Sequence, residues 1–172
     1  MWMETDKIFK EGMMNWNLGN PKEAGKNFEK VLSIDPNHEE ALVRLGNVLG
    51  KIGKYQDAVT FYDRALKLDS KNSLALVNKG LCFHYLKQYD NAIQCFDGVL
   101  EEKPQNTTAI YNKISSLVKK GEIKQGIDLL SELVKIDYSF KYKAKFDIDF
   151  QHIKTNNDFQ KIVAWSMTKH KD

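Results

Sequence analysis

Apolar residues recur along most of the chain at spacings of three and four, which is the period of an amphipathic α-helix. In residues 39–72 this pattern runs through Leu42 and Leu45, breaks at Gly53, and resumes over a second stretch that ends near Leu66. Each stretch is long enough for a helix, and the break between them is short and polar. The pattern therefore predicts two helices joined by a tight turn.

The same pattern repeats with a period of 34 residues. Four segments align without gaps, at residues 5–38, 39–72, 73–106 and 107–140. Three positions of the repeat stand out. The eighth position holds Gly12, Gly46, Gly80 and Ile114, and the twentieth holds Ala24, Ala58, Ala92 and Gly126. The twenty-fourth position holds Phe28, Tyr62, Phe96 and Leu130. Small residues let paired helices approach closely, and the large residue fills the space beside them. One helix pair cannot bury its own apolar face, so we expect successive pairs to stack.

Glycine occupies the turn between the two helices in three of the four segments, at Gly19, Gly53 and Gly121. Helices commonly end in a left-handed residue, a conformation that glycine adopts at little cost. Lys87 takes this place in the third segment. We therefore expect a local loss of stability at Lys87.

These residues resemble the tetratricopeptide repeat family, whose 34-residue unit is a helix-turn-helix with small, aromatic and terminal proline residues in these places. The resemblance covers residues 5–140 and is closest in the second and third segments, which carry Gly46, Tyr55, Ala58, Tyr62, Gly80, Tyr89, Ala92, Phe96 and Pro104. It implies an all-α fold, a right-handed superhelical solenoid of antiparallel helix pairs. Residues 1–4 would form a short lead.

Residues 141–172 follow the last repeat and are too apolar for a free tail. The resemblance implies that they form a C-terminal helical cap, with Phe146, Phe150, Phe159 and Ile162 covering the last helix pair. Asp147 and Asp149, or Asn156 and Asp158, would cap its helices. An alternative interpretation is a basic helix that seeks an anion or a membrane, since the segment holds seven Lys against four Asp.

The resemblance also implies that the first helix of each pair lines a concave, partner-binding face. On that frame the inner wall would hold Phe9, Met13, Val43, Arg44, Asn47, Lys51, Val77, Asn78, Leu81, Tyr85, Tyr111 and Asn112. Exposed apolar side chains commonly serve a partner, and Asn amides can pair with the backbone of an extended peptide. We expect a groove for a peptide or helix of another protein. The alternative for any single apolar member is a place in the core.

One class of the family grips the terminal carboxylates of chaperone tails with two Lys, two Asn and one Arg. Counted from the second segment, the places of that clamp hold Val43, Asn47, Asn78, Thr108 and Asn112; counted from the first, they hold Phe9, Met13, Arg44, Leu74 and Asn78. The alignment from the second segment has both Asn residues of the clamp and lacks all three of its cations. The alignment from the first segment matches the clamp at no position. A complete carboxylate clamp is therefore absent.

Charge and composition argue against several other classes of function. The net charge is only +3, and two of the 26 basic residues are Arg, which disfavours nucleic acid as a partner. No apolar run is long enough for a membrane span, and the start lacks a signal peptide, so we expect no membrane association and a cytoplasmic location.

Catalytic and metal-binding signatures are missing from the sequence. Cys82 and Cys95 match no zinc or redox spacing, and the four His do not pair at helical spacing with another ligand. No phosphate loop or nucleophile elbow is present. We expect no cofactor, no metal and no catalysis. The prediction is a protein-binding module or scaffold, with a monomer favoured. The alternatives are a regulatory subunit of an enzyme complex and a homo-oligomeric structural module joined through its ends.

Overall fold

A computed structural model of the chain describes residues 2–164, and this part is helical throughout its regular structure. The elements are α1 (Trp2–Asn17), α2 (Pro21–Ile34), α3 (Glu39–Lys51), α4 (Tyr55–Leu68), α5 (Ser73–Tyr85), α6 (Tyr89–Glu102), α7 (Thr107–Lys120), α8 (Ile123–Ile136), α9 (Ser139–Phe146), the 3-10 helix η1 (Ile148–Ile153) and α10 (Asn157–Val163). Because α1 begins at Trp2, most of residues 1–4 belong to a helix and not to a lead.

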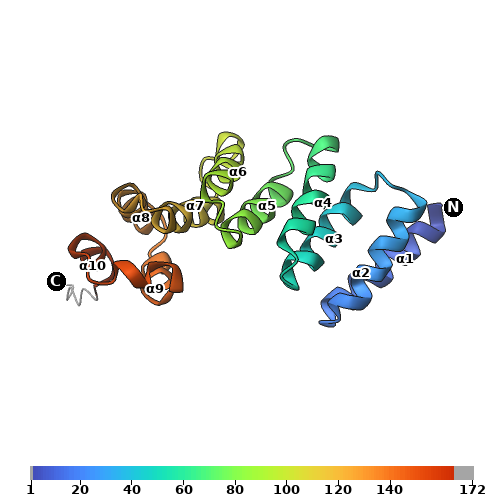
Figure 1. Cartoon of the computed structure of the whole chain (residues 1–172), viewed down its shortest axis with the longest axis horizontal. Helices are drawn as coiled ribbons and strands as arrows, with labels where there is room; N and C mark the ends of the chain where they lie inside the picture. The colour runs from blue at the N-terminus through green and yellow to red at the C-terminus, as the bar shows by residue number, and fades with distance from the viewer. Residues whose placement is uncertain (1, 165–172) are drawn as a thin grey trace, which may run out of the picture. The chain divides into compact units, whose positions relative to one another are not determined.

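Each sequence repeat is one antiparallel helix pair: α1 with α2, α3 with α4, α5 with α6, and α7 with α8 (Figure 1). The described residues divide into two compact units, one up to Pro104 and one from Gln105 onward. In the first unit, α2 packs on α3 and α4 packs on α5, so three consecutive pairs stack. The predicted all-α fold of stacked helix pairs is confirmed.

Glycine makes the close approach of paired helices possible. A Cβ placed on Gly46 would lie 2.6 Å from a ring carbon of Tyr62, and one on Gly80 would lie 2.6 Å from a ring carbon of Phe96. Both rings are buried. The eighth place of the repeat is therefore filled by the aromatic ring of the twenty-fourth.

In the last repeat, the residue at the eighth position is larger than in the other repeats and the residue at the twentieth position is smaller. Ile114 stands on α7 where the other pairs have glycine, and Gly126 stands on α8 where they have alanine. Ile114 is fully buried, and a Cβ on Gly126 would lie 2.6 Å from Val118 Cγ2. Volume gained on one helix is thus balanced by volume lost on the other, which keeps the core filled.

The turns within the pairs follow the sequence prediction. Gly19, Gly53 and Gly121 have left-handed φ angles of +77°, +80° and +101°, and Lys87 takes the same conformation with φ of +60°. No other described non-glycine residue has a positive φ. Lys87 therefore carries the backbone strain that its place in the repeat predicts.

The second unit has its own hydrophobic core, which α7, α8 and the closing segment share. Phe150 and Phe159 are buried in it, with their rings stacked at 5.6 Å between centroids. The prediction that Phe146 is also buried is wrong, because it is 75% exposed. Ala144 supplies the buried side of α9, and a residue two places further along a helix points to the opposite side.

Side-chain caps begin the last two helices. Asp147 accepts a hydrogen bond from the backbone N–H of Asp149 at the start of η1. Asn156 accepts from the N–H groups of Asp158 and Phe159 at the start of α10. Of the predicted capping residues, Asp147 and Asn156 are thus confirmed as caps.

Candidate functional site

The faces of α3 and α5 that carry the predicted wall lie beside each other in the first unit. We call this surface the α3–α5 groove, and it is lined by Glu40, Val43, Arg44, Asn47 and Lys51 of α3 and by Leu74, Asn78, Leu81 and Tyr85 of α5. On each helix these residues follow spacings of three and four, so they share one face. The groove contains two pockets, one toward the start of the helices and one toward their ends.

The pocket toward the helix ends, the aromatic pocket, has a volume of about 340 Å³. It is lined by Trp16, Asn47, Gly50, Lys51, Tyr55, Tyr62, Asn78, Leu81, Cys82 and Tyr85. Five of these residues belong to the predicted wall. Helices α1, α3, α4 and α5 all contribute, so the pocket exists only where consecutive pairs stack.

Two asparagine amides and one tyrosine hydroxyl form the polar floor of the aromatic pocket. The Tyr62 hydroxyl donates to Asn47 Oδ1 at 2.7 Å, and Asn78 Nδ2 donates to the same oxygen at 2.8 Å. Burial raises the pKa of Tyr62 above its ordinary value, so the hydroxyl keeps its proton and needs an acceptor. This requirement fixes the orientation of the Asn47 amide. The Asn47 NH₂ group and the Asn78 carbonyl are left to bind other groups.

Aromatic rings form the walls of the same pocket. The rings of Tyr55 and Tyr85 stack with centroids 5.0 Å apart, and Lys51 Nζ lies 5.7 Å from the centre of the Trp16 ring. Tyr85 is 59% exposed although its ring is stacked. Flat apolar walls of this kind suit an apolar side chain of a ligand.

Cys82 contributes an unreactive part of the lining. It is 3% exposed, and burial raises the pKa of its thiol to about 11. Burial likewise raises the pKa of Cys95 to about 11. Nucleophilic attack and metal binding both require the thiolate, so the aromatic pocket lacks an activated sulfur.

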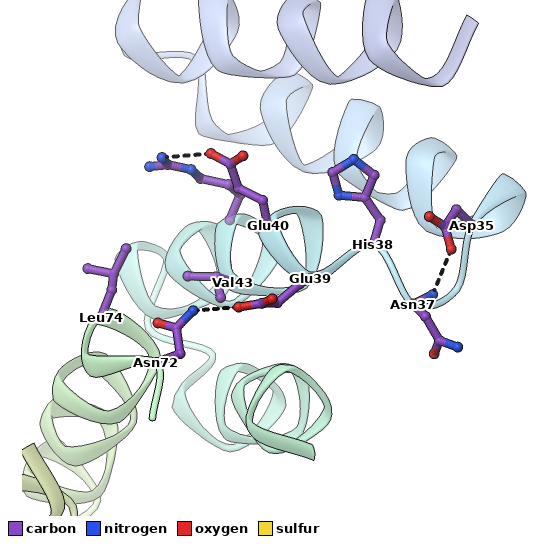
Figure 2. A pocket seen from close by; sticks show the side chains of 9 residues that line it. Asp35, Asn37, His38, Glu39, Glu40, Val43, Asn72 and Leu74 are labelled. Carbon is purple, nitrogen blue, oxygen red and sulfur yellow. Dashed lines mark hydrogen bonds and ion pairs between the residues drawn. The ribbon is translucent and has the colours of Figure 1, made fainter. Parts of the chain in front are cut away.

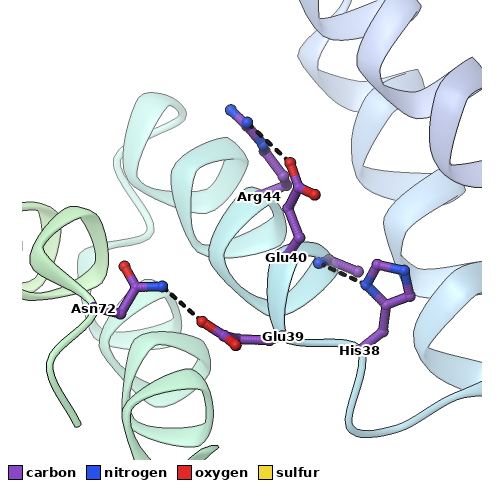
Figure 3. Close-up of polar contacts among 6 residues, drawn as sticks. His38, Glu39, Glu40, Arg44 and Asn72 are labelled. Atoms are coloured by element: carbon purple, nitrogen blue, oxygen red, sulfur yellow. Dashed lines mark hydrogen bonds and ion pairs between the residues drawn. The ribbon is translucent and has the colours of Figure 1, made fainter. Parts of the chain in front are cut away.

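The second pocket, the polar pocket, has a volume of about 490 Å³ and lies where α3 and α5 begin (Figure 2). Its lining is Asp35, Asn37, His38, Glu39, Glu40, Val43, Arg44, Asn72 and Leu74. Figure 3 shows Arg44 reaching back to Glu40, an ion pair of 3.2 Å, and Asn72 donating to Glu39 at 2.7 Å.

His38 is occupied as a helix cap and is not available as a ligand or base. Its Nδ1 accepts a hydrogen bond of 3.2 Å from the backbone N–H of Ala41, and its ring stacks on Phe9 with centroids 5.1 Å apart. Asn72 and Asn106 occupy the corresponding places at α5 and α7. The polar pocket is therefore built mainly from groups that already satisfy one another.

The predicted wall residues fall into three groups. The structure brings Asn47, Lys51, Asn78, Leu81 and Tyr85 together in the aromatic pocket, and Val43 and Arg44 in the polar pocket. Phe9 and Met13 pack partly buried against the core, while Val77 is half-buried and lines neither pocket. Tyr111 and Asn112 belong to the second unit.

Two of these predictions need correction, because the side chains are not exposed. Val43 is 3% exposed, so it offers the groove little surface. Tyr111 is 2% exposed and lies against Phe140 and Phe150. Its hydroxyl donates to Asp147 at 2.7 Å, so it belongs to the core of the second unit.

Five residues that line the aromatic pocket lie outside the predicted wall, and two of them, Trp16 and Tyr55, supply aromatic rings to its sides. Trp16 lies near the end of α1, at a place that the predicted wall did not include, and Tyr55 begins α4, which is the second helix of its pair. The available signal was the aromatic residue that follows the turn in two of the repeats, Tyr55 and Tyr89.

Between residues 2 and 164, no three His, Cys, Asp or Glu side chains are placed to hold a metal ion. Over the described helices, none combines the length and apolar character needed to cross a membrane.

The chain resembles known proteins in sequence and in fold. A family model described as anaphase-promoting complex, cyclosome, subunit 3 matches residues 17–99. No curated protein sequence matches the chain. Among solved structures, MamA 41-end from Desulfovibrio magneticus RS-1 is 23% identical and has a TM-score of 0.80, over 92% of this chain and 88% of MamA.

Two further structures carry descriptions that mention peptides. YrrB, described as a TPR protein with an unusual peptide-binding site, is 15% identical with a TM-score of 0.73, over 90% of this chain and 80% of YrrB. The first TPR of Spaghetti (RPAP3), bound to the HSP90 peptide SRMEEVD, is 18% identical with a TM-score of 0.64, over 66% of this chain and 90% of that one. At these identities the likeness concerns the fold.

Proposed function

We propose that the chain, whose repeats and fold resemble those of tetratricopeptide repeat proteins, is a non-catalytic protein-interaction module. Its ligand is an extended segment of a partner protein, bound along the α3–α5 groove. The observation that carries this proposal is the paired amides of Asn47 and Asn78 at the floor of the aromatic pocket.

The free groups of the two amides complement one peptide group of a ligand. Asn47 offers an N–H donor and Asn78 offers a carbonyl acceptor, because Asn47 Oδ1 is already bonded to Tyr62 and Asn78. A peptide group has one carbonyl to accept from Asn47 and one N–H to donate to Asn78. The Tyr62 hydroxyl keeps this pair oriented before the ligand arrives.

An extended segment satisfies this geometry better than a helix does. The backbone N–H and carbonyl groups of a helix are bonded within the helix, so they are not free to pair with side-chain amides. An extended chain keeps these groups available and points alternate side chains to one side. One such side chain would enter the aromatic pocket between Trp16 and Tyr85.

Descriptions of two structural relatives support a peptide as the ligand. YrrB is described by its peptide-binding site, and the Spaghetti repeat was solved with a peptide bound. Because the cations of the carboxylate clamp are missing, we expect this chain to recognise a peptide through amides and aromatic rings, without a contact to a terminal carboxylate.

The proposal can be tested with peptides selected on the purified chain from a random display library. Asn78→Leu removes the carbonyl acceptor at similar size, and Leu81→Glu puts a charge on the apolar wall. We expect each substitution to weaken the selected peptides about tenfold or more, because an unpaired buried peptide group costs roughly 1–3 kcal/mol. Helicity should be nearly unchanged, since both side chains are only partly buried.

The matched control is Asn91→Leu, which replaces an exposed amide on α6 that donates to Gln88 and lies outside the α3–α5 groove. It should leave peptide affinity unchanged. N-methylation of each ligand peptide group in turn should identify one position at which binding is lost. Equal affinity of the wild-type chain and both groove variants would rule out the α3–α5 groove as the binding site.

A further inference from the structure

The exposed apolar surface of the second unit is concentrated in one short segment. Its exposed large hydrophobic residues, over the part that the structure describes, are Ile136, Tyr138, Tyr142, Phe146 and Ile148. Phe146 and Ile148 are 75% and 78% exposed. Single exposed apolar residues are ordinary, whereas a cluster of this kind commonly marks a contact surface.

Three of these residues form a row that we call the aromatic ridge: Tyr138 directly before α9, and Tyr142 and Phe146 within it. Tyr138, Tyr142 and Phe146 are four residues apart in sequence, so they follow one another along the same side of the helix. The rings of Tyr138 and Tyr142 meet edge to face at 5.8 Å between centroids. Ala144 faces the core on the other side of α9, so the ridge is directed outward.

Lys143 and Lys145 stand beside members of the aromatic ridge in the sequence of α9, and α9 has no carboxylate. Lys145 Nζ lies 5.8 Å from the centre of the Phe146 ring, and Lys143 Nζ lies 3.9 Å from the centre of the Tyr111 ring. The nearest acidic residue along the chain, Asp147, accepts hydrogen bonds from the Tyr111 hydroxyl and from a backbone N–H. Asp147 therefore has local partners, and α9 itself carries only basic and uncharged side chains.

We propose that the aromatic ridge is a second docking surface, and that it binds an amphipathic helix of a partner protein whose apolar stripe is bordered by Glu and Asp. A row of side chains at spacings of four forms the ridge that packs into the groove of another helix. Tyrosine is favoured at protein interfaces, and Lys143 and Lys145 supply the charge complementarity. This surface is separate in sequence and in residues from the α3–α5 groove.

An anionic membrane fits the same residues less well. Phe146 and Ile148 are the most exposed residues of the segment, and α9 is only eight residues long, so little apolar area is available for insertion. Ile148 also lies between Asp147 and Asp149, whose charges an anionic surface repels. A protein partner can place its own carboxylates beside the lysines and avoid these two residues.

The test uses the full chain and two synthetic helical peptides of about three heptads, which have the same Leu stripe bordered by Glu or by Lys. Vesicles with and without phosphatidylserine form a third arm. We expect the wild-type chain to bind the Glu-bordered peptide at least about tenfold more tightly than the Lys-bordered one, and to bind neither kind of vesicle.

Two double variants separate the apolar and charged parts of the surface. Tyr142→Ser with Phe146→Ser should abolish binding of both peptides, and Lys143→Glu with Lys145→Glu should reverse the preference. Lys22→Glu with Lys30→Glu makes the same change of charge at exposed lysines of α2 and should alter nothing. Asn78→Leu should also be silent, because it tests the groove alone.

Three results would overturn the proposal. They are equal binding of the two peptides by the wild-type chain, full binding by the Tyr142 and Phe146 variant, and selective binding of phosphatidylserine vesicles without peptide binding. Circular dichroism should show native helicity in every variant, since the substituted side chains lie at the surface. If the serine variant does not fold, the reversal of preference in the glutamate variant decides the question.

Discussion

At the scale of single residues, Lys87 shows how the repeat constrains a position that its own side chain does not suit. The turn between α5 and α6 needs a left-handed residue, and the equivalent turns between α1 and α2, α3 and α4, and α7 and α8 have glycine there. A side chain in that conformation costs roughly 1–2 kcal/mol. The cost is local because Lys87 is exposed.

Lys87→Gly should raise the free energy of unfolding by about 0.5–1 kcal/mol, because relief of the strain outweighs the added entropy of glycine in the unfolded chain. Urea unfolding followed by circular dichroism measures the change. Lys54→Gly is the control, since Lys54 has a φ of −84° and carries no such strain. A midpoint for Lys87→Gly that is equal to or below that of the wild type contradicts the argument.

Burial also controls the two cysteines. Cys82 and Cys95 are 3% and 7% exposed, with the pKa of each thiol raised to about 11. At pH 8 the reactive thiolate should therefore be rare in the folded chain. We expect a thiol reagent such as Ellman's reagent to react slowly with the native protein and fully with both cysteines in guanidinium. Rapid stoichiometric labelling of the native chain would show that one thiol is activated.

At the scale of helices and helix pairs, the repeat period determined most of what could be predicted. Helix pairing, the turn glycines and the glycine contacts with large rings all depend on local spacing, which recurs every 34 residues. The error at Val43 falls within the second repeat, whereas those at Tyr111 and Phe146 lie where the period stops. Tyr111 has a wall position on the repeat frame, but Phe140 and Phe150 cover it, and no spacing before residue 140 indicates where the closing segment folds back.

The candidate site was predictable in the same uneven way. The repeat pattern predicted Asn47, Asn78 and Leu81, because they lie on equivalent faces of the first helices of their pairs. Trp16 reaches the aromatic pocket from the end of a different helix pair, a contact that depends on how far the pairs rotate as they stack. That rotation is set by side-chain packing across the whole interface, which the apolar pattern does not encode.

Gly80→Ala should cost about 1–3 kcal/mol of stability, since the new Cβ would lie 2.6 Å from the buried Phe96 ring. The matched control is Gly98→Ala on α6, where the new Cβ meets only Leu76 Cδ1 at an ordinary 3.7 Å. Alanine there should stabilise the helix by about 0.5–1 kcal/mol. Chemical denaturation of both variants measures the difference, and equal effects of the two substitutions would contradict the packing described for Gly80.

At the scale of the whole molecule, two hydrophobic cores stabilise the described part of the chain, one in each unit. The core of the second unit includes Phe150, Ile153 and Phe159 from the closing segment as well as residues of α7 and α8. Removing the closing segment would expose Tyr111, Leu130 and Leu133, which are now buried. The closing segment is therefore needed for this unit to remain folded.

Deletion of residues 141–172 should lower the melting temperature and cause aggregation, because burial of each phenylalanine contributes about 1.5–3 kcal/mol. Deletion of only residues 167–172, which lie outside the described residues and are polar apart from Met167, should change neither property. Size-exclusion chromatography and thermal melts measure both effects. A monomeric 1–140 fragment with an undiminished melting temperature would show that the closing segment is dispensable.

The large Ile114 and the small Gly126 together determine which segment of this chain can be exchanged with the equivalent segment of another repeat. A chimera that replaces α7 alone with the sequence of α5 sets a glycine where Ile114 fills the core, while α8 keeps its own glycine, and the void costs several kcal/mol. If the sequences of α5 and α6 replace both α7 and α8, the eighth position becomes glycine and the twentieth becomes alanine, so the two side chains again match each other. The module of recombination in this protein is therefore the helix pair, and two helices of different pairs are not interchangeable parts even when both match the repeat.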